Sequence, residues 1–190
     1  MFKDHASKSP LMIYDFIYAV LNQAILLPIT ADSQDTALII FNTLNARGLP
    51  LSDADIFKAK IYNHLDNDGK KEFIEAWKAL DENATAANES IQSLFYYYMF
   101  FLRAEENDKS STTPGIRSYF TKNKNERLFD EHLMQNLDTI LNLWRVINVH
   151  EELNEAWSKN PFILQAMDIL TSYPNEFWKY PVIIFYLKHR

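Results

Sequence analysis

Glycine is the residue whose scarcity limits the fold most, because the 190-residue chain contains only 3 glycines. Glycine adopts left-handed backbone conformations more readily than any other residue, and the tight turns of β-hairpins require such conformations. A β-rich fold with many hairpins is therefore disfavoured, whereas long helices joined by polar loops are favoured. The sequence predicts an all-α fold, a predominantly helical bundle of seven to nine helices with at most one short strand pair.

The apolar residues recur with the spacing of amphipathic helices along most of the chain. This periodicity predicts helices over residues 9–24, 33–46, 52–65, 70–80, 91–103, 116–122, 126–153 and 161–173, with an extension of the fourth helix to 89 as the alternative. "ILLPIT" at 25–30 indicates a short extended segment, and "DNDG" at 66–69 indicates a turn. The helix at 91–103 carries aromatic residues at consecutive positions, so more than one of its faces must be covered, and we expect it at the centre of the core.

Composition excludes several classes of protein. The chain is 47% hydrophobic and 23% charged, which is ordinary for a folded domain. It has no cysteine, which excludes disulfides, a thiol nucleophile and thiolate zinc sites. Neither a signal peptide nor an apolar run long enough to span a membrane is present in the sequence. We expect a cytoplasmic protein without a membrane partner.

The chain is expected to form a single helical domain over 1–190, with a subdivision into 1–104 and 116–190 around a polar loop as the alternative. The sequence ends on "PVIIFYLKHR", which resembles the first part of a buried element. We therefore expect a piece of a longer protein that exposes apolar surface around 177–187 and favours self-association.

Two histidine-containing segments resemble metal-binding motifs without completing them. "HEELN" begins like a zinc-protease helix at His150, but Asn154 stands where the second histidine is required. The segment 64–75 spaces its acids like a calcium-binding loop, but His64 stands where the first acid is required. The sequence therefore predicts no metal site.

One basic segment interrupts an otherwise acidic chain. The net charge of −6 argues against attraction of nucleic acid to the whole surface, yet residues 109–127 carry five basic residues and one acid. Aromatic residues are interleaved with the basic ones, a mixture that suits phosphate contacts and base stacking. The candidate DNA-binding residues are Arg117, Lys122, Lys124 and Arg127. A solvated loop is the alternative.

The break between the second and third predicted helices is the strongest functional signal in the sequence. Gly48 suits the left-handed position past a helix end, and Ser52 with Asp55 forms a capping box. Neither role explains Asn45 and Arg47. An amide, a guanidinium and a nearby helix N-terminus together attract an anion such as phosphate. Alternatively, the acids at 53 and 55 hold Arg47 in a structural pair.

The stretch "IFNTLNARGLPLSDADIFKAKIY" resembles the signature of the N-terminal domain of GmrSD-type, modification-dependent restriction enzymes. That signature reads Phe-x-x-Leu-Asn-x-Arg-Gly, a spacer, Leu-Ser or Leu-Thr, then Asp and Lys. The matching residues are Phe41, Leu44, Asn45, Arg47, Gly48, Leu51, Ser52, Asp55 and Lys58. The match covers about two dozen residues.

The resemblance implies an anti-phage defence protein whose N-terminal domain binds and hydrolyses a nucleoside triphosphate, with Mg²⁺, and drives a nuclease that cuts modified DNA. It implies nucleotide-binding roles, in the parent protein, for Asn45, Arg47, Gly48, Ser52, Asp55 and Lys58. The family's Asp-Gly-Gln-Gln-Arg segment and its histidine–asparagine–histidine nuclease are absent from this sequence. Those two parts are the expected partners. The chain is expected to hold no cofactor and to lack activity alone, as the helical portion of an NTP-dependent DNA endonuclease.

Two alternatives belong to other classes. In a helical protein-interaction scaffold, Asn45 and Arg47 would only cap and pair, and the aromatic helix would present a partner surface. A stand-alone enzyme would need a nucleophile, metal ligands or a phosphate-binding loop, none of which the sequence offers.

Overall fold

The computed structural model describes residues 10–23, 28, 30–32, 36, 40 and 52–189, with the side chains of 10–12 left aside. Contacts divide the chain into two compact units, residues 1–50 and 51–190. The first unit contains α2 (Pro10–Gln23), which confirms the helix expected over 9–24. The helix expected over 33–46 and the extended segment at 25–30 lie mostly outside the described residues.

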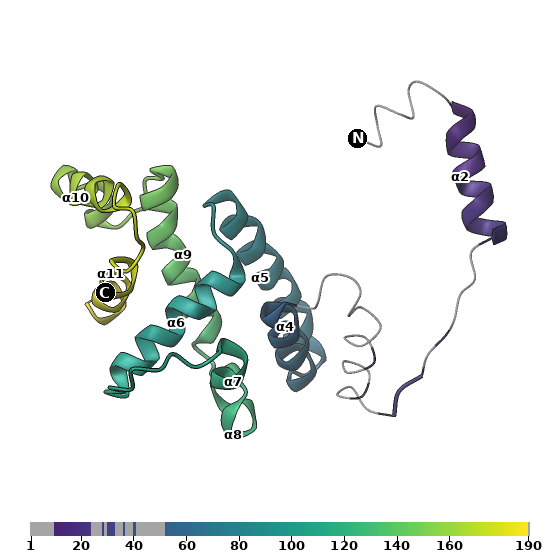
Figure 1. The fold of residues 1–190 in the computed structure, drawn as a ribbon, viewed down its shortest axis with the longest axis horizontal. Coiled ribbons are helices and arrows are strands. Elements are labelled where there is room, and N and C mark those ends of the chain that lie inside the picture. The colour runs from purple at the N-terminus through teal and green to yellow at the C-terminus, as the bar shows by residue number, and fades with distance from the viewer. Residues whose placement is uncertain are drawn as a thin grey trace. The chain divides into compact units, whose positions relative to one another are not determined.

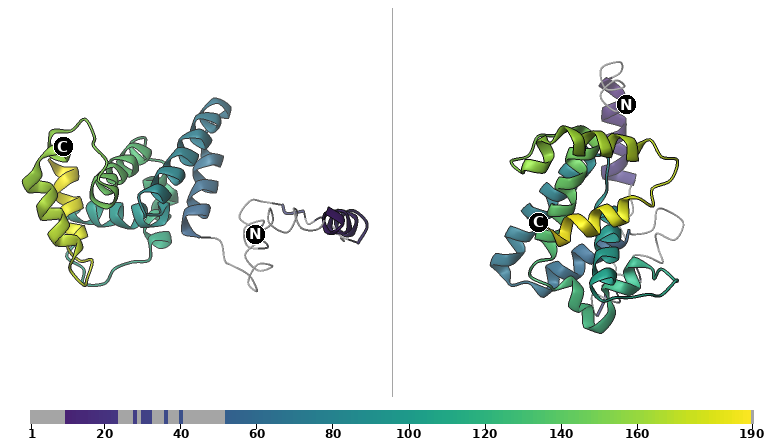
Figure 2. Two further views of the ribbon diagram at one scale, coloured as in Figure 1. Left: turned by 90° about the horizontal axis from the view of Figure 1, so that it is seen from above. Right: turned by 90° about the vertical axis from the view of Figure 1, so that its left-hand side faces the viewer.

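The described residues of the second unit form helices and the loops that join them (Figures 1 and 2). Its α-helices are α4 (Asp53–His64), α5 (Asn67–Ala86), α6 (Ile91–Glu105), α7 (Ile116–Phe120), α8 (Lys122–Asn125), α9 (Leu133–Val149), α10 (Pro161–Thr171) and α11 (Lys179–Lys188). Two 3-10 turns, η2 (Glu126–Leu128) and η3 (Ala156–Lys159), precede α9 and α10. The described residues thus form nine α-helices and no strand, which confirms the predicted all-α class.

Helix α6 is the centre of the second unit. It packs against α4, α5, α7, α9 and α11, and Figure 1 shows it crossing between them. Its buried side chains come from several faces, among them Phe95, Tyr98 and Met99. This confirms the expectation that the aromatic helix is central. The elements before and after the polar loop at 106–115 share one hydrophobic core.

A buried arginine at the end of α6 holds the polar loop in place. Arg103 Nε donates to the carboxylate of Asp108 at 2.7 Å, and Nη2 donates to the carbonyl oxygens of Ser110 and Thr112 at 2.9 and 3.3 Å. The hydrogen bond from Arg103 lowers the pKa of Asp108 below its ordinary value. The loop then leads directly into α7, which places Ile116 against the core.

The prediction of a single long helix over 126–153 is wrong. Residues 126–128 form η2, and α9 begins only at Leu133. Before the break, Asn123, Lys124 and Asn125 have left-handed φ angles of 49°, 59° and 66°. After η2, the Asp130 carboxylate accepts a hydrogen bond from the His132 amide at 2.7 Å. Short polar side chains that bond to nearby backbone groups compete with helix formation, so the helix is interrupted here.

The prediction of a turn at 66–69 is also wrong. Asp66 is the N-cap of α5, and its Oδ1 accepts a hydrogen bond from the Gly69 amide at 2.8 Å. Residues 67–69 therefore belong to the first turn of the helix. Asp66 caps the helix, and the helix begins at the next residue. These residues therefore do not form the loop that a calcium-binding hand requires.

The C-terminal helices expose apolar side chains. Helix α10 buries none of its residues fully, and Phe162 is 79% exposed. In the expected range 177–187, Phe177 and Phe185 are exposed while Ile183 and Leu187 are buried. None of the helices in the described ranges is both long and apolar enough to cross a lipid bilayer.

Candidate functional site

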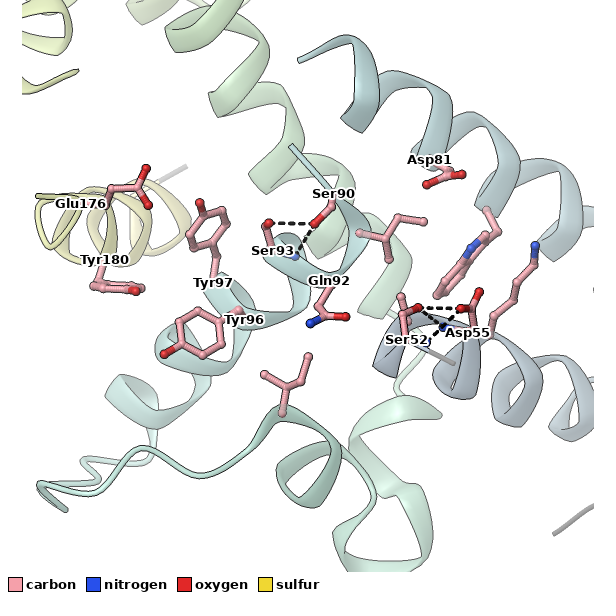
Figure 3. Close-up of a pocket in the computed structure, with 15 residues that line it drawn as sticks. Ser52, Asp55, Asp81, Ser90, Gln92, Ser93, Tyr96, Tyr97, Glu176 and Tyr180 are labelled. Atoms are coloured by element: carbon pink, nitrogen blue, oxygen red, sulfur yellow. Dashed lines mark hydrogen bonds between the residues drawn. The ribbon is translucent and has the colours of Figure 1, made fainter. Parts of the chain in front are cut away.

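A groove of about 710 Å³ opens between α4, α5 and α6, with the start of α7 and of α11 at its edges (Figure 3). The lining residues include hydroxyl, carboxylate and aromatic side chains in roughly equal share. They are Ser52, Ala54, Asp55, Lys58, Trp77, Asp81, Ser90, Ile91, Gln92, Ser93, Tyr96, Tyr97, Ile116, Glu176 and Tyr180. A cavity of this volume lies within the range that small-molecule and cofactor sites occupy.

The first turn of α4 forms one wall of the groove. The Asp55 amide donates to Ser52 Oγ at 3.1 Å, and the Ser52 amide donates to Asp55 Oδ2 at 3.2 Å. This reciprocal pair confirms the predicted capping box. Lys58 lies one helical turn beyond Asp55, and its Nζ lies 6.0 Å from the centroid of the Trp77 ring. The structure therefore brings Ser52, Asp55 and Lys58 together at one groove.

The first turns of α6 form the facing wall. Ser90 caps the helix by accepting a hydrogen bond from the Ser93 amide at 3.1 Å, and the two hydroxyl oxygens lie 2.8 Å apart. Tyr96, one turn along, makes an edge-to-face contact with Phe100 at 5.2 Å between ring centroids and with Tyr180 at 6.1 Å. Figure 3 shows Gln92 projecting from this wall toward the side of the groove that carries Ser52.

A buried polar cluster lies behind the α6 end of the groove. Glu89 and Lys179 have side chains only 6% and 13% exposed, and their charged groups are 3.6 Å apart. The Tyr97 hydroxyl donates to Glu89 Oε1 at 3.3 Å, and Lys179 Nζ donates to the Tyr97 hydroxyl oxygen at 3.3 Å. Burial raises the pKa of Glu89 above its ordinary value although Lys179 opposes the shift, and burial also raises the pKa of Tyr97.

The predicted nucleotide-binding residues divide into two groups. Ser52, Asp55 and Lys58 line the groove. Asn45, Arg47 and Gly48 lie outside the described residues. Asp53, one of the two acids considered as a partner for Arg47, forms an ion pair at 2.7 Å with Arg117 instead of standing free.

The four predicted DNA-binding residues differ in their surroundings. Arg117 pairs with Asp53, and Arg127 Nη2 pairs with Glu106 at 2.6 Å while its guanidinium stacks over the Tyr119 ring at 4.1 Å. Lys122 and Lys124 are exposed. Acids thus pair with half of the basic set, and among the described residues no salt bridge joins Lys122 or Lys124 to an acid.

The charges around the groove bear on metal binding. The groove lining holds three carboxylates, Asp55, Asp81 and Glu176, and the cation of Lys58, while Lys179 outside the lining pairs with Glu176 at 2.8 Å. Within the described ranges, no group of three or more His, Asp or Glu side chains is placed to hold a metal ion. Mg²⁺ is commonly held by one or two carboxylates together with substrate phosphates. A Mg²⁺ ion at this groove would therefore arrive with a phosphate ligand, and Asp55, one helical turn from Lys58, would meet it through Oδ1, the oxygen that the capping box does not use.

Comparisons with family models, curated proteins and solved structures find no match for this chain. The likeness to GmrSD-type enzymes accordingly rests on the residues of the signature stretch.

Proposed function

We propose that the chain is the helical portion of the N-terminal, nucleotide-dependent domain of a GmrSD-like restriction protein, and that its groove binds a nucleoside triphosphate. One observation carries the proposal: Ser52, Asp55 and Lys58, which match the second half of the family signature, line the same groove as two aromatic side chains of α6. A flat base needs an aromatic wall and a phosphate needs a cation, and this groove offers both.

Within this proposal, Lys58 contacts the phosphates and Ser52 with Asp55 fixes the start of α4 that presents it. The resemblance also assigns nucleotide binding to Arg47, which lies outside the described residues. Mg²⁺ supplies charge neutralisation of the phosphates when bound. Hydrolysis and DNA cleavage require the Asp-Gly-Gln-Gln-Arg segment and the nuclease domain, so this chain is proposed to bind nucleotide without turnover.

The first test is the affinity of the chain for ATP with Mg²⁺, measured by isothermal titration calorimetry. Lys58→Ala is expected to weaken binding about 10-fold or more, because a hydrogen bond to a charged group contributes about 1.5–3 kcal/mol. Lys71→Ala is the matched control, since Lys71 is an exposed lysine of α5 outside the groove. Equal affinities for the Lys58 variant and wild type would contradict the proposed role of the groove.

A role in DNA contact is proposed for Lys122 and Lys124, which are exposed, whereas the exposed Arg117 already pairs with Asp53. Replacing both by alanine is expected to weaken DNA binding and to reduce the slope of log affinity against log salt by about 2, because two phosphate contacts are lost. A fluorescence anisotropy titration at several salt concentrations measures both quantities. The double variant of Lys71 and Lys78 serves as the control, and an unchanged slope would remove DNA from the proposal.

The exposed apolar side chains of α10 and α11 favour a second candidate, a protein-interaction scaffold. Five large apolar side chains are exposed over these elements and the segment between them: Phe162, Ile169, Tyr173, Phe177 and Phe185. Contiguous exposed apolar surface is typical of interaction sites. If the wild-type chain binds no nucleotide in the calorimetric test, the scaffold becomes the favoured function.

A further inference from the structure

Most polar side chains around the groove are already committed to one another. Ser52 and Asp55 bond in the capping box, and Ser90 bonds with Ser93. Glu176 pairs with Lys179 at 2.8 Å, and the Tyr97 hydroxyl is bonded to Glu89. A ligand would have to break these interactions in order to use the same groups.

Three polar side chains of the groove have no hydrogen bond or ion pair with another described residue. They are Lys58 of α4, Asp81 of α5 and Gln92 of α6. The three come from three different helices, and Figure 3 shows Asp81 and Gln92 on opposite sides of the opening. One is a cation, one is an acceptor-only carboxylate, and one is an amide that both donates and accepts.

We propose that Asp81 and Gln92 form a nucleoside subsite, in which Asp81 accepts a hydrogen bond from a ribose hydroxyl and Gln92 reads an adenine base. This inference rests on the proposed function, because Lys58 is taken to hold the phosphates of the same ligand. It adds the class of substrate, an adenine ribonucleotide, and two residues that lie outside the signature stretch.

The role of Asp81 follows from the chemistry of the sugar. A carboxylate only accepts hydrogen bonds at neutral pH, and ribose offers hydroxyl donors. An acidic side chain on the ribose 2′-hydroxyl is the arrangement that other nucleotide sites use. A 2′-deoxynucleotide lacks that donor and would leave the carboxylate without its partner, so the site distinguishes ribose from deoxyribose.

The role of Gln92 follows from the pattern of donors and acceptors on the base. Adenine offers a donor at N6 beside an acceptor at N7, and a side-chain amide matches both at once. On the same edge guanine offers two acceptors, O6 and N7, which an amide can satisfy only in part. The Tyr96 ring, fixed by its contacts with Phe100 and Tyr180, provides a surface for stacking beside this amide.

Three ligands, ATP, GTP and 2′-deoxy-ATP, each with Mg²⁺, test the inference by calorimetry on the whole chain. The wild-type chain is expected to bind ATP about 10-fold more tightly than GTP, from one bidentate contact. It is expected to bind ATP about 10-fold more tightly than 2′-deoxy-ATP, from one hydrogen bond to a carboxylate. The readout is the ratio of affinities for two ligands on the same variant. Removing a carboxylate also changes the attraction of the phosphates, but all three ligands carry the same phosphates, so the ratio cancels this effect.

Two variants assign these preferences to residues. Gln92→Ala is expected to bring the ATP-to-GTP ratio close to one and to leave the ratio of ATP to 2′-deoxy-ATP unchanged. Asp81→Ala is expected to bring the ratio of ATP to 2′-deoxy-ATP affinity close to one and to leave the ATP-to-GTP ratio unchanged. Gln135→Ala and Glu82→Gln are the matched controls, since both residues are exposed on helices outside the groove lining.

The outcomes separate this inference from the function on which it rests. If ATP, GTP and 2′-deoxy-ATP bind with affinities that depend on Lys58 but with ratios near one, the groove binds nucleotides and the nucleoside subsite is overturned. Ratios that persist in both variants would overturn the roles of Asp81 and Gln92. If none of the three ligands binds the wild-type chain, the proposed function fails, and the subsite fails with it.

Discussion

Replacing Lys179 by methionine is expected to lower the free energy of unfolding by about 3 kcal/mol near pH 7.5. Lys179 and Glu89 form an ion pair whose side chains are almost fully buried. Removing one partner of a buried pair leaves an uncompensated charge in the interior, which costs about 3–5 kcal/mol. The lower end applies because the Tyr97 hydroxyl continues to donate to Glu89. Urea unfolding followed by tryptophan fluorescence measures the difference.

This loss of stability should depend on pH, and the pKa of Glu89 decides whether the loss grows or shrinks as pH is lowered. Burial raises the pKa of Glu89 in the folded state above its ordinary value of 4.5. The folded state thus favours the protonated carboxyl, a stabilisation present below pH 4.5 and lost as pH rises through the folded pKa. The variant lacks the cation that lowers this pKa, so its folded pKa is higher still. The difference in free energy of unfolding between the wild type and the Lys179→Met variant should therefore become smaller as pH is lowered toward 4.5.

Two further variants control for effects other than the buried charge. Adding Glu89→Gln to Lys179→Met should restore part of the lost stability, because the uncompensated carboxylate is removed with its partner. Lys188→Met removes an ion pair with Glu105 whose side chains are 60% and 47% exposed, so it should cost less than about 1 kcal/mol. A loss for Lys179→Met that is the same at every pH would contradict the assignment to Glu89.

The sequence predicted those parts of the fold that local chemistry decides. Ser52 and Asp55 satisfy each other's backbone at the start of α4, and Pro161 begins α10 where its fixed φ angle suits the first turn. The central place of α6 followed from aromatic residues on several faces of one helix. The break at Asp130 was missed because the apolar periodicity of 126–153 continues through it, while a single side chain bonded to the His132 amide stops the helix.

Only part of the candidate site could be predicted from the sequence, and the reason differs from the one that applies to the fold. Ser52, Asp55 and Lys58 are close in sequence, and helical spacing alone indicates that they share one end of α4. Asp81 and Gln92 enter the groove from α5 and α6, and neither belongs to a motif. The pairing of Glu89 with Lys179 joins residues far apart in the chain. Such contacts depend on how helices pack, which no local pattern encodes.

Replacing Phe95 by alanine is expected to lower the free energy of unfolding by about 4 kcal/mol, because truncating a buried phenylalanine costs about 3–5 kcal/mol. Phe95 is fully buried, and its ring centroid lies 4.7 Å from that of Phe57, 6.2 Å from Trp77 and 5.1 Å from Phe120. Those three rings belong to α4, α5 and α7, so one side chain of α6 connects the helices around the groove.

The matched control is Phe162→Ala, which removes the same ring from a position that is 79% exposed and should change stability by less than about 0.5 kcal/mol. Calorimetric melting and urea unfolding measure both variants. Similar losses for the two would mean that the ring of Phe95 is not the connection that the packing indicates. At temperatures where the Phe95 variant remains folded, its affinity for ATP should also fall, because α4 is no longer held against α6 and the two walls of the groove lose their common support.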